Sequence, residues 1–163
     1  LEGAAAGYLP LAHSADIIIE VRVPEHLPYL WVDAALIGRV LNNLVDNAIK
    51  FAPDGSRVLL WACPDPSPGS RNLRLGVSDE GPGIPAEEQD VLFEKFHRVA
   101  SVKGRRAGTG LGLPFCKLAV EAHGGKIWVE SPSSALGSRD AGSAFVMTLP
   151  TEASHKPPRP SSP

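Results

Sequence analysis

The run Gly108-Thr109-Gly110-Leu111-Gly112-Leu113, with Asp79-Glu80-Gly81-Pro82-Gly83-Ile84 about thirty residues earlier, decides the fold of this chain. Each run sets glycines beside apolar residues, where the backbone can come close to another group. The second run opens a predicted helix, and the N–H groups at a helix N-terminus favour a phosphate. Neither run is a Walker A loop or has the strand context of a Rossmann fold. Each alone also fits an ordinary turn, but together they predict a nucleotide site of another kind.

A helix with an unusual polar stripe is predicted from Asp33, a favourable N-cap, to about Phe51. Its apolar face is formed by Ile37, Leu41, Leu44, Val45 and Ala48, and the opposite stripe by Arg39, Asn43, Asp46, Asn47 and Lys50. Asn is a poor helix former, so Asn43 and Asn47, one turn apart, point to a use for their amide oxygens. Mg2+ prefers hard oxygen ligands of this kind. A solvated or locally hydrogen-bonded face is the alternative.

The other elements follow from periodicity and from Gly and Pro positions. Strands are predicted over 16–23, 57–63, 73–78, 126–131 and 143–149, with a short helix over 85–93 and a longer one over 110–123. On the longer helix Leu111, Phe115, Leu118, Ala119 and Ala122 share one side. Residues 94–107, rich in basic residues, predict a mobile loop. One α/β domain over 16–150 is therefore expected, between a flexible N-terminal segment (1–15) and a disordered tail (151–163).

Composition narrows the function classes. A chain of 163 residues can bury one sizeable core, and its net charge of −2 argues against a nucleic-acid surface. Cys63 and Cys116 have no metal-site spacing, so both are expected to be buried small hydrophobic residues in a reducing compartment. No apolar run approaches the roughly 20 residues that span a bilayer. A soluble, cytoplasmic polypeptide is expected, whether free or part of a membrane-bound sensor.

Four runs match, in order, the motifs of one family. Residues 41–51, Leu-Asn-Asn-Leu-Val-Asp-Asn-Ala-Ile-Lys-Phe, resemble the N box of sensor histidine kinases. Residues 79–85 resemble their first glycine box, 93–96 their F box and 108–113 their second glycine box. The resemblance covers about residues 17–150. It implies an ATP-binding catalytic domain with an α/β sandwich fold, in which helices cover one face of a mixed sheet and a flexible lid covers the nucleotide.

The resemblance implies a role for each matching residue. Asn47 would be the Mg2+ ligand, and Asn43 and Lys50 would approach the metal and the phosphates. Asp79 would accept a hydrogen bond from the adenine amino group. Arg98 would lie in the lid near the terminal phosphate and serve catalysis with Asn43 and Lys50. Further nucleotide contacts would come from Phe51, Gly81, Gly83, Ile84, Phe96, Gly108, Thr109, Gly110, Leu111, Gly112 and Leu113.

The resemblance also implies partners. The γ-phosphoryl of Mg-ATP would pass to a histidine on a separate dimerisation and phosphoacceptor domain, for relay to a response regulator. None of the five histidines stands in an acceptor setting, so the acceptor is expected outside this chain. The chain alone is expected to be monomeric and its parent homodimeric, with no nucleic-acid or direct membrane contact. The lid departs from the family pattern at His97 and Ala107, where Tyr and Gly are usual.

Two other functions stay open at this point. An ATPase of the same superfamily, such as the gyrase and chaperone domains, carries glutamate where Asn43 stands, to activate water. Asn43 cannot act as that base, so phosphoryl transfer is favoured over hydrolysis. A nucleotide-binding module without chemistry is the second alternative, and the presence of Asn43, Asn47, Lys50, Asp79 and the glycines argues against it.

Overall fold

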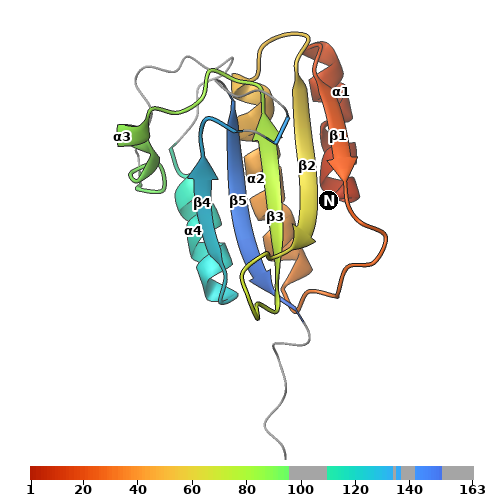
Figure 1. Cartoon of the computed structure of the whole chain (residues 1–163). Helices are drawn as coiled ribbons and strands as arrows, with labels where there is room; N and C mark the ends of the chain where they lie inside the picture. Colours follow the sequence, from red (N-terminus) through yellow and green to blue (C-terminus); the bar gives the residue numbers. More distant parts are fainter. Residues whose placement is uncertain (96–109, 134, 137–141, 152–163) are drawn as a thin grey trace, which may run out of the picture.

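The computed structural model of the chain describes residues 1–95, 110–133, 135–136 and 142–151, and these form a five-stranded sheet with helices on one side (Figure 1). The strands lie in the order β1 (Ile18–Arg22), β2 (Arg57–Pro64), β3 (Asn72–Asp79), β5 (Ser143–Pro150) and β4 (Lys126–Glu130). β1 is parallel to β2, and the other neighbouring pairs are antiparallel. The predicted two-layer α/β sandwich with a mixed sheet is confirmed.

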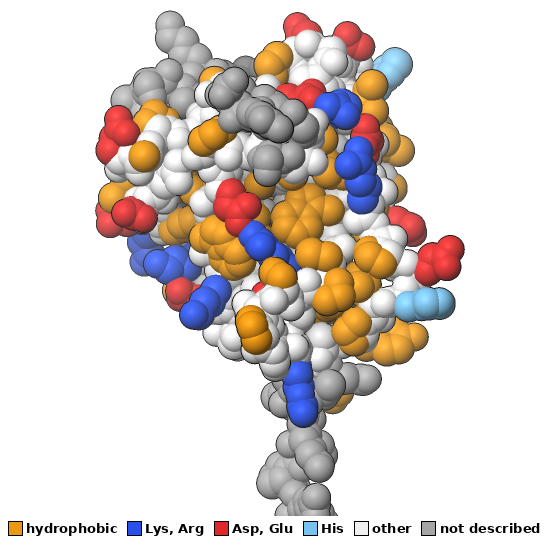
Figure 2. All heavy atoms as spheres, in the orientation of Figure 1, with side chains coloured by type: hydrophobic (Ala, Val, Ile, Leu, Met, Phe, Trp, Pro, Cys, Tyr) orange, Lys and Arg blue, Asp and Glu red, His pale blue; other side chains and the backbone are white. Residues whose placement is uncertain are grey.

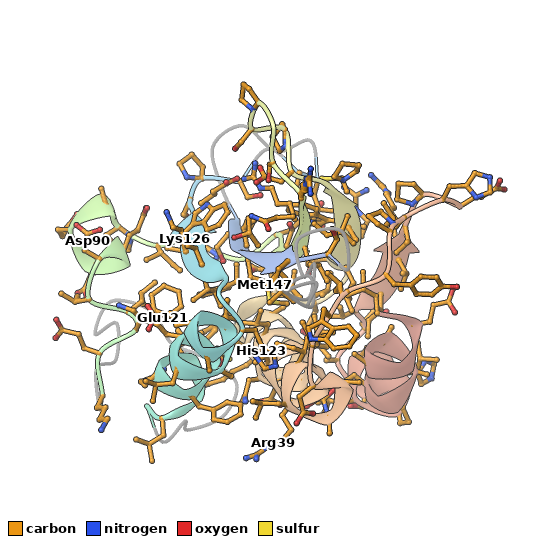
Figure 3. The ribbon with its side chains drawn as sticks, turned by 90° about the horizontal axis from the view of Figure 1, so that it is seen from below. Arg39, Asp90, Glu121, His123, Lys126 and Met147 are labelled. Carbon is orange, nitrogen blue, oxygen red and sulfur yellow. The ribbon has the colours of Figure 1, made fainter. Side chains whose placement is uncertain are left out.

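Three helices form the second layer: α1 (Glu2–Ser14), α2 (Ala34–Phe51) and α4 (Gly112–Ala122). Seen from below, they lie in one row under the sheet with α2 in the middle (Figure 3). The short α3 (Ala86–Gln89) lies outside this row, on the β4 side of the sheet (Figure 1). The core fills the space between helices and strands, and its fully buried side chains include Val40, Leu44, Ile49, Val58, Leu60, Val77, Val120, Met147 and Leu149.

The expectation of a flexible segment over residues 1–15 is wrong, because α1 occupies most of it. Ala5 and Ala12 are buried, seven positions apart, and Tyr8 between them packs against the core. This spacing is the apolar stripe of a helix, and alanine is the best helix former. Pro10 stands inside α1 and is solvent-exposed. Residues 2–14 therefore form a helix that packs against α2.

The apolar side predicted for the longer helix is only in part the side that α4 buries. Leu111 and Leu118 are 45% and 62% exposed, and Ala122 is exposed too. The residues that α4 buries are Pro114, Cys116, Ala119 and Val120. Small residues dominate that set because α4 approaches α2 closely, with the Cys116 thiol 3.8 Å from the Val40 carbonyl oxygen. The larger leucines stay outside this contact.

Several other boundaries move by a few residues. β1 starts at Ile18 instead of Asp16, and α3 ends at Gln89 instead of continuing to Phe93. Cys63 is only half-buried, so it does not share the buried setting of Cys116.

The predicted tail begins one residue too early, because Thr151 is buried and donates both its N–H and its hydroxyl to the Arg71 carbonyl oxygen. Residues 152–163 lie outside the described part of the chain. Among the helices that the structure describes, none has the length and apolar character needed to cross a membrane.

The sheet face opposite the helices is covered in its middle by tryptophan side chains. Trp61 on β2 and Trp128 on β4 flank Arg74 on β3, whose guanidinium carbon lies 5.8 Å and 5.1 Å from their ring centroids. Gly76 permits this arrangement, because a Cβ there would lie 2.3 Å from a Trp61 ring atom. Arg74 also pairs with Glu130. Figure 2 shows hydrophobic side chains in the middle of this face, with acidic and basic side chains between them and around them.

His123 joins the two helices that carry the predicted site. It is the C-cap residue of α4, and its Nε2 accepts a 3.0 Å hydrogen bond from the N–H of Asp33, the N-cap of α2. The Asp33 N–H can only donate, so Nδ1 carries the ring proton and donates it to the Ala119 carbonyl oxygen at 2.7 Å. Figure 3 shows His123 where α4 meets α2. The C-terminus of α4 is therefore tied to the N-terminus of α2.

Candidate functional site

The predicted amide stripe lies on α2, which begins where the sequence indicated. The Asp33 carboxylate accepts a 2.9 Å hydrogen bond from the Leu36 N–H, as an N-cap residue does. The Asn43 side-chain nitrogen donates to the Arg39 carbonyl oxygen at 3.0 Å. The locally hydrogen-bonded alternative is therefore correct for this one nitrogen. The bond also fixes the amide, so that its oxygen faces the start of α4.

Two residues of the polar stripe face neighbouring helices, Asp46 toward α1 and Arg39 toward α4. The pKa of Tyr8 on α1 is raised mainly by the burial of its own side chain and in addition by the negative charge of Asp46. Arg39 points the other way and lies 4.6 Å from the centroid of the Phe115 ring on α4. Asn47 is half-buried. The surface left for a ligand is consequently narrower than the sequence pattern suggested.

The second glycine run meets this stripe at the N-terminus of α4. Gly112 is the first residue of α4, and a Cβ there would lie 3.1 Å from the Asn43 amide oxygen. Gly110, two residues earlier, has a φ of +71°, a left-handed conformation that favours glycine. Leu111 is the N-cap residue, and Leu113 packs against the core. The N–H groups of the first turn of α4 are thus next to Asn43.

Asp79 is the last residue of β3 and is almost completely buried, with 4% of its surface exposed. One carboxylate oxygen accepts a 2.8 Å hydrogen bond from the Gly81 N–H, and the other accepts a 2.6 Å bond from the Ser143 hydroxyl. Burial raises the pKa of this carboxyl above its usual range, and the bonds from Ser143 and Gly81 oppose that rise only in part. Within the described ranges, the hydrogen bonds of this carboxylate come from neutral groups, and a buried carboxylate in such surroundings is costly to keep, which is typical of a functional position.

The first glycine run passes between Asp79 and the end of α2. A Cβ on Gly81 would lie 2.6 Å from the Asp79 Oδ1 atom and 3.1 Å from the Phe51 carbonyl oxygen. Glycine is required there because the backbone is confined on two sides. Gly83 has a φ of +77°, and Ile84 packs against the edge of the core. This loop therefore brings Asp79 close to Phe51, two residues to which the resemblance assigns contacts with the base.

The last turn of α2 carries the remaining predicted residues on this side. Phe51 is the final residue of the helix and is half-buried. The Lys50 ammonium lies 4.8 Å from the centroid of the Phe51 ring. A cation in the last turn also suits the negative end of the helix dipole. Lys50 and Phe51 therefore stand together at the Asp79 end of α2, one to two turns from Asn43 and Asn47.

Four of the predicted residues, Phe96, Arg98, Gly108 and Thr109, lie outside the described part of the chain, and so does most of the predicted mobile loop.

Other residues around the site were not singled out by the sequence. Ser143 faces Asp79 because β5 pairs with β3, a contact across 64 positions that local spacing cannot reveal. Glu80 belongs to the first glycine run but had no assigned role. It accepts bonds from the Arg57 side chain at 2.6 and 3.2 Å and from the Arg57 N–H at 2.9 Å. These bonds lower the pKa of Glu80 and raise the pKa of Arg57.

Several known proteins are similar to this chain over most of its length. The adaptive-response sensory kinase SasA of Prochlorococcus marinus is 37% identical over 137 residues, which are 84% of this chain and 34% of that protein. The chain thus spans about a third of the length of this relative.

The structure of the mycobacterial sensor histidine kinase MprB has a TM-score of 0.75 at 34% identity, and the match covers 92% of this chain and 94% of that one. Full-length ShkA in complex with AMPPNP gives a TM-score of 0.76 at 28% identity, covering 92% of this chain and 29% of that one. Residues 32–153 match the family model that unites such proteins. This chain belongs to the histidine kinase-, DNA gyrase B- and HSP90-like ATPase family.

Proposed function

We propose that this chain is the ATP-binding catalytic domain of a two-component sensor histidine kinase. The proposal rests on the way that α2 touches both glycine runs, with Asn43 against Gly112 and Phe51 against Gly81. Eight residues of helix separate the two contacts, which is about 12 Å at 1.5 Å per residue. A nucleotide lying along α2 would meet the Asp79 loop with one end and the N-terminus of α4 with the other.

The Asp79 end is suited to the base. Its carboxylate is fixed by two neutral hydrogen bonds and keeps further acceptor capacity for the adenine amino group. Gly81 and Gly83 would let the loop backbone approach the base edge. Phe51 and Ile84 would supply apolar contacts beside it. A buried, oriented acceptor of this kind discriminates strongly against a base without the matching donor.

The α4 end is suited to the phosphates. Gly110 and Gly112 shape the start of the helix, where the N–H groups of the first turn and the helix dipole favour an anion. Leu111 and Leu113 would contribute their backbone at the same place. We extend this role to Gly108 and Thr109, and we assign contacts over the nucleotide to Phe96 and Arg98.

The amides of α2 fit a magnesium ion between these two ends. The Asn43 nitrogen is engaged with the Arg39 carbonyl, which leaves a hard amide oxygen facing Gly112. We propose that Asn47 is the metal ligand and that Asn43 stands beside it. When bound, Mg2+ would neutralise part of the phosphate charge. Lys50 and Arg98 would add positive charge as the γ-phosphoryl group is transferred.

Transfer, rather than hydrolysis, follows from the nature of Asn43. An amide has no proton-accepting nitrogen or carboxylate with which to activate water, and its nitrogen is already committed to the Arg39 carbonyl oxygen. Phosphoryl transfer asks the protein mainly to orient the groups and to stabilise charge. The acceptor would be a histidine on the dimerisation domain of the parent kinase, a homodimer, for relay to a response regulator. We place this reaction in the cytoplasm.

The test mixes this chain, ATP labelled on the γ-phosphate and a dimerisation domain that carries the acceptor histidine. Acid-labile label should appear on that domain. Asn47→Ala should reduce the transfer rate by about a hundredfold or more, because metal coordination supplies several kcal/mol of charge stabilisation. Asn42→Ala is the matched control, since Asn42 is exposed on the same helix and should leave the rate unchanged.

Two results would redirect the proposal. ATP binding without transfer to any cognate acceptor would favour a nucleotide-binding module. Release of inorganic phosphate at a substantial rate without an acceptor would favour an ATPase.

A further inference from the structure

One hydroxyl group connects the first glycine run to the start of β5. The Ser131 Oγ atom accepts a 2.8 Å hydrogen bond from the Ile84 N–H and donates a 2.9 Å bond to the Gly142 carbonyl oxygen. Ser131 directly follows β4, so three segments far apart in the sequence meet at this atom. The hydroxyl uses both its donor and an acceptor position, which leaves neither neighbouring backbone group unpaired.

Three further hydrogen bonds link these segments to one another and to α3. The Gly142 N–H donates to the Gly81 carbonyl oxygen at 2.8 Å. The Gln89 side-chain nitrogen on α3 donates to the carbonyl oxygens of Ile84 and Ser131 at 2.9 and 3.0 Å. The backbone from Gly81 to Ile84 is therefore held at both of its ends by groups outside the loop.

Gly142 shows how little freedom this arrangement leaves. Its φ is +85°, and a Cβ on it would lie 2.3 Å from the Asp79 carbonyl oxygen. The next residue, Ser143, donates its hydroxyl to the Asp79 carboxylate. A displacement of Gly142 would thus move the hydroxyl that orients Asp79. Ser131, by holding Gly142, acts on both the glycine loop and the carboxylate.

We infer that Ser131 is a positioning residue for recognition of the base. Its hydroxyl sets the loop backbone at Gly81–Ile84 and the Asp79 carboxylate in one fixed relation, so that both face the same edge of adenine. This role rests on the proposed function, because it requires that Asp79 bind the adenine amino group. Ser131 itself would not touch the nucleotide.

The variant that tests this role is Ser131→Ala, and Ser133→Ala is its matched control. Ser133 lies on the same segment and is buried, but among the described residues its hydroxyl accepts only from the Ala135 N–H and has no hydrogen bond to the glycine loop. Ser131→Ala should raise the Kd for ATP about tenfold, the effect of one to two ordinary hydrogen bonds. The Kd for ADP should rise by the same factor, since the phosphates would lie at the other end of α2.

Discrimination between bases separates positioning from a general structural role. Purine riboside triphosphate lacks the 6-amino group, so the ratio of its Kd to that of ATP reports the Asp79 contact. Ser131→Ala should lower this ratio about fivefold or more, while Ser133→Ala should keep the wild-type ratio. A variant that is only less stable would change both affinities by one factor and would leave the ratio as it is.

Amide hydrogen exchange without nucleotide tests the contact itself. Exchange at Ile84 should be faster in Ser131→Ala than in the wild-type chain and unaffected in Ser133→Ala. Unchanged exchange at Ile84, or faster exchange with an unchanged base ratio, would overturn the inference. A wild-type chain that binds ATP no better than purine riboside triphosphate would instead overturn the base assignment within the proposed function, and the inference with it.

If Ser131→Ala does not fold, Gln89→Ala is the alternative variant. Gln89 is half-buried on α3, and this substitution removes its hydrogen bond to the Ile84 carbonyl oxygen. Gln89→Ala should lower the base ratio about threefold. An unchanged ratio in that variant would overturn the inference.

Discussion

Replacing Asp79 with Asn should weaken ATP binding and at the same time remove a pH-dependent loss of stability. Asp79 is 4% exposed and bonded to two neutral groups, and burial raises its pKa. A carboxyl whose pKa is higher in the native than in the unfolded state contributes stability while it is protonated, below its unfolded pKa. That contribution is lost as the pH rises through the native pKa. Raising the pH from acid to neutral therefore lowers the contribution of Asp79 to the stability of the wild-type chain.

The Asn variant is nearly isosteric and keeps an oxygen that can accept from the Gly81 N–H. The Ser143 hydroxyl must turn from donor to acceptor, which costs about 1 kcal/mol at any pH. The difference in unfolding free energy between variant and wild type should therefore shift in favour of Asn as the pH rises from about 4 to about 8. Urea denaturation across this range measures that shift.

The loss of ATP affinity has its own magnitude. A hydrogen bond to a charged group contributes about 1.5–3 kcal/mol, so Asp79→Asn should raise the Kd for ATP by about 10- to 150-fold. Purine riboside triphosphate, without the amino group, should lose much less. Calorimetric titration of both nucleotides against both proteins gives the comparison. Equal losses for the two nucleotides would refute the assigned contact with the adenine amino group.

Glu80→Gln is the matched control, because the neighbouring carboxyl has the opposite pKa shift. Its bonds from Arg57 lower the pKa of Glu80, so they stabilise the chain above the unfolded pKa and cease to do so as the pH falls. Glu80→Gln should therefore be less stable than the wild type at neutral pH and approach it in acid. A stability difference for Asp79→Asn that followed the same direction would show that burial does not dominate at Asp79.

Two further predictions concern groups away from the nucleotide. Burial raises the pKa of the Cys116 thiol to about 12, so iodoacetamide at about pH 8 should label the half-buried Cys63 first, and mass spectrometry should find Cys116 labelled only after unfolding; early labelling of Cys116 would contradict its buried setting. His123→Ala should lower the melting temperature by about 2–8 °C, because it removes the bond to the Asp33 N–H, whereas the exposed His26→Ala should leave it unchanged.

Local sequence signals were sufficient where an element carries its own periodicity and caps. α2 was predicted within a residue, because its apolar face, its Asp33 cap and the Pro53 stop agree. The prediction is wrong for α1 because its local signals conflict: the alanines favour a helix, whereas Gly3, Gly7 and the internal Pro10 oppose one. It is packing of Ala5 and Ala12 that makes this segment a helix. The structure of this segment depends on tertiary contacts, and the sequence of residues 1–15 alone does not contain them.

The site divides in the same way. The glycine runs and the amide stripe could be found because each is compact in sequence, and the structure brings Asn43 next to Gly112. The groups that hold Asp79 in place could not be found, because Ser143 reaches it only through strand register. On α4 the error came from the assumption that large apolar side chains face inward. The close approach to α2 instead selects Cys116 and other small residues.

The position of β5 has a consequence for synthesis of the protein. β5 is the last strand in the sequence, yet it lies between β3 and β4 in the sheet. While the chain is still emerging from the ribosome, β3 lacks its neighbour and Asp79 lacks the Ser143 hydroxyl. The proposed nucleotide site therefore cannot be complete until residues 142–150 have left the exit tunnel, and we expect that a nascent chain that stops before them is not stabilised by cellular ATP.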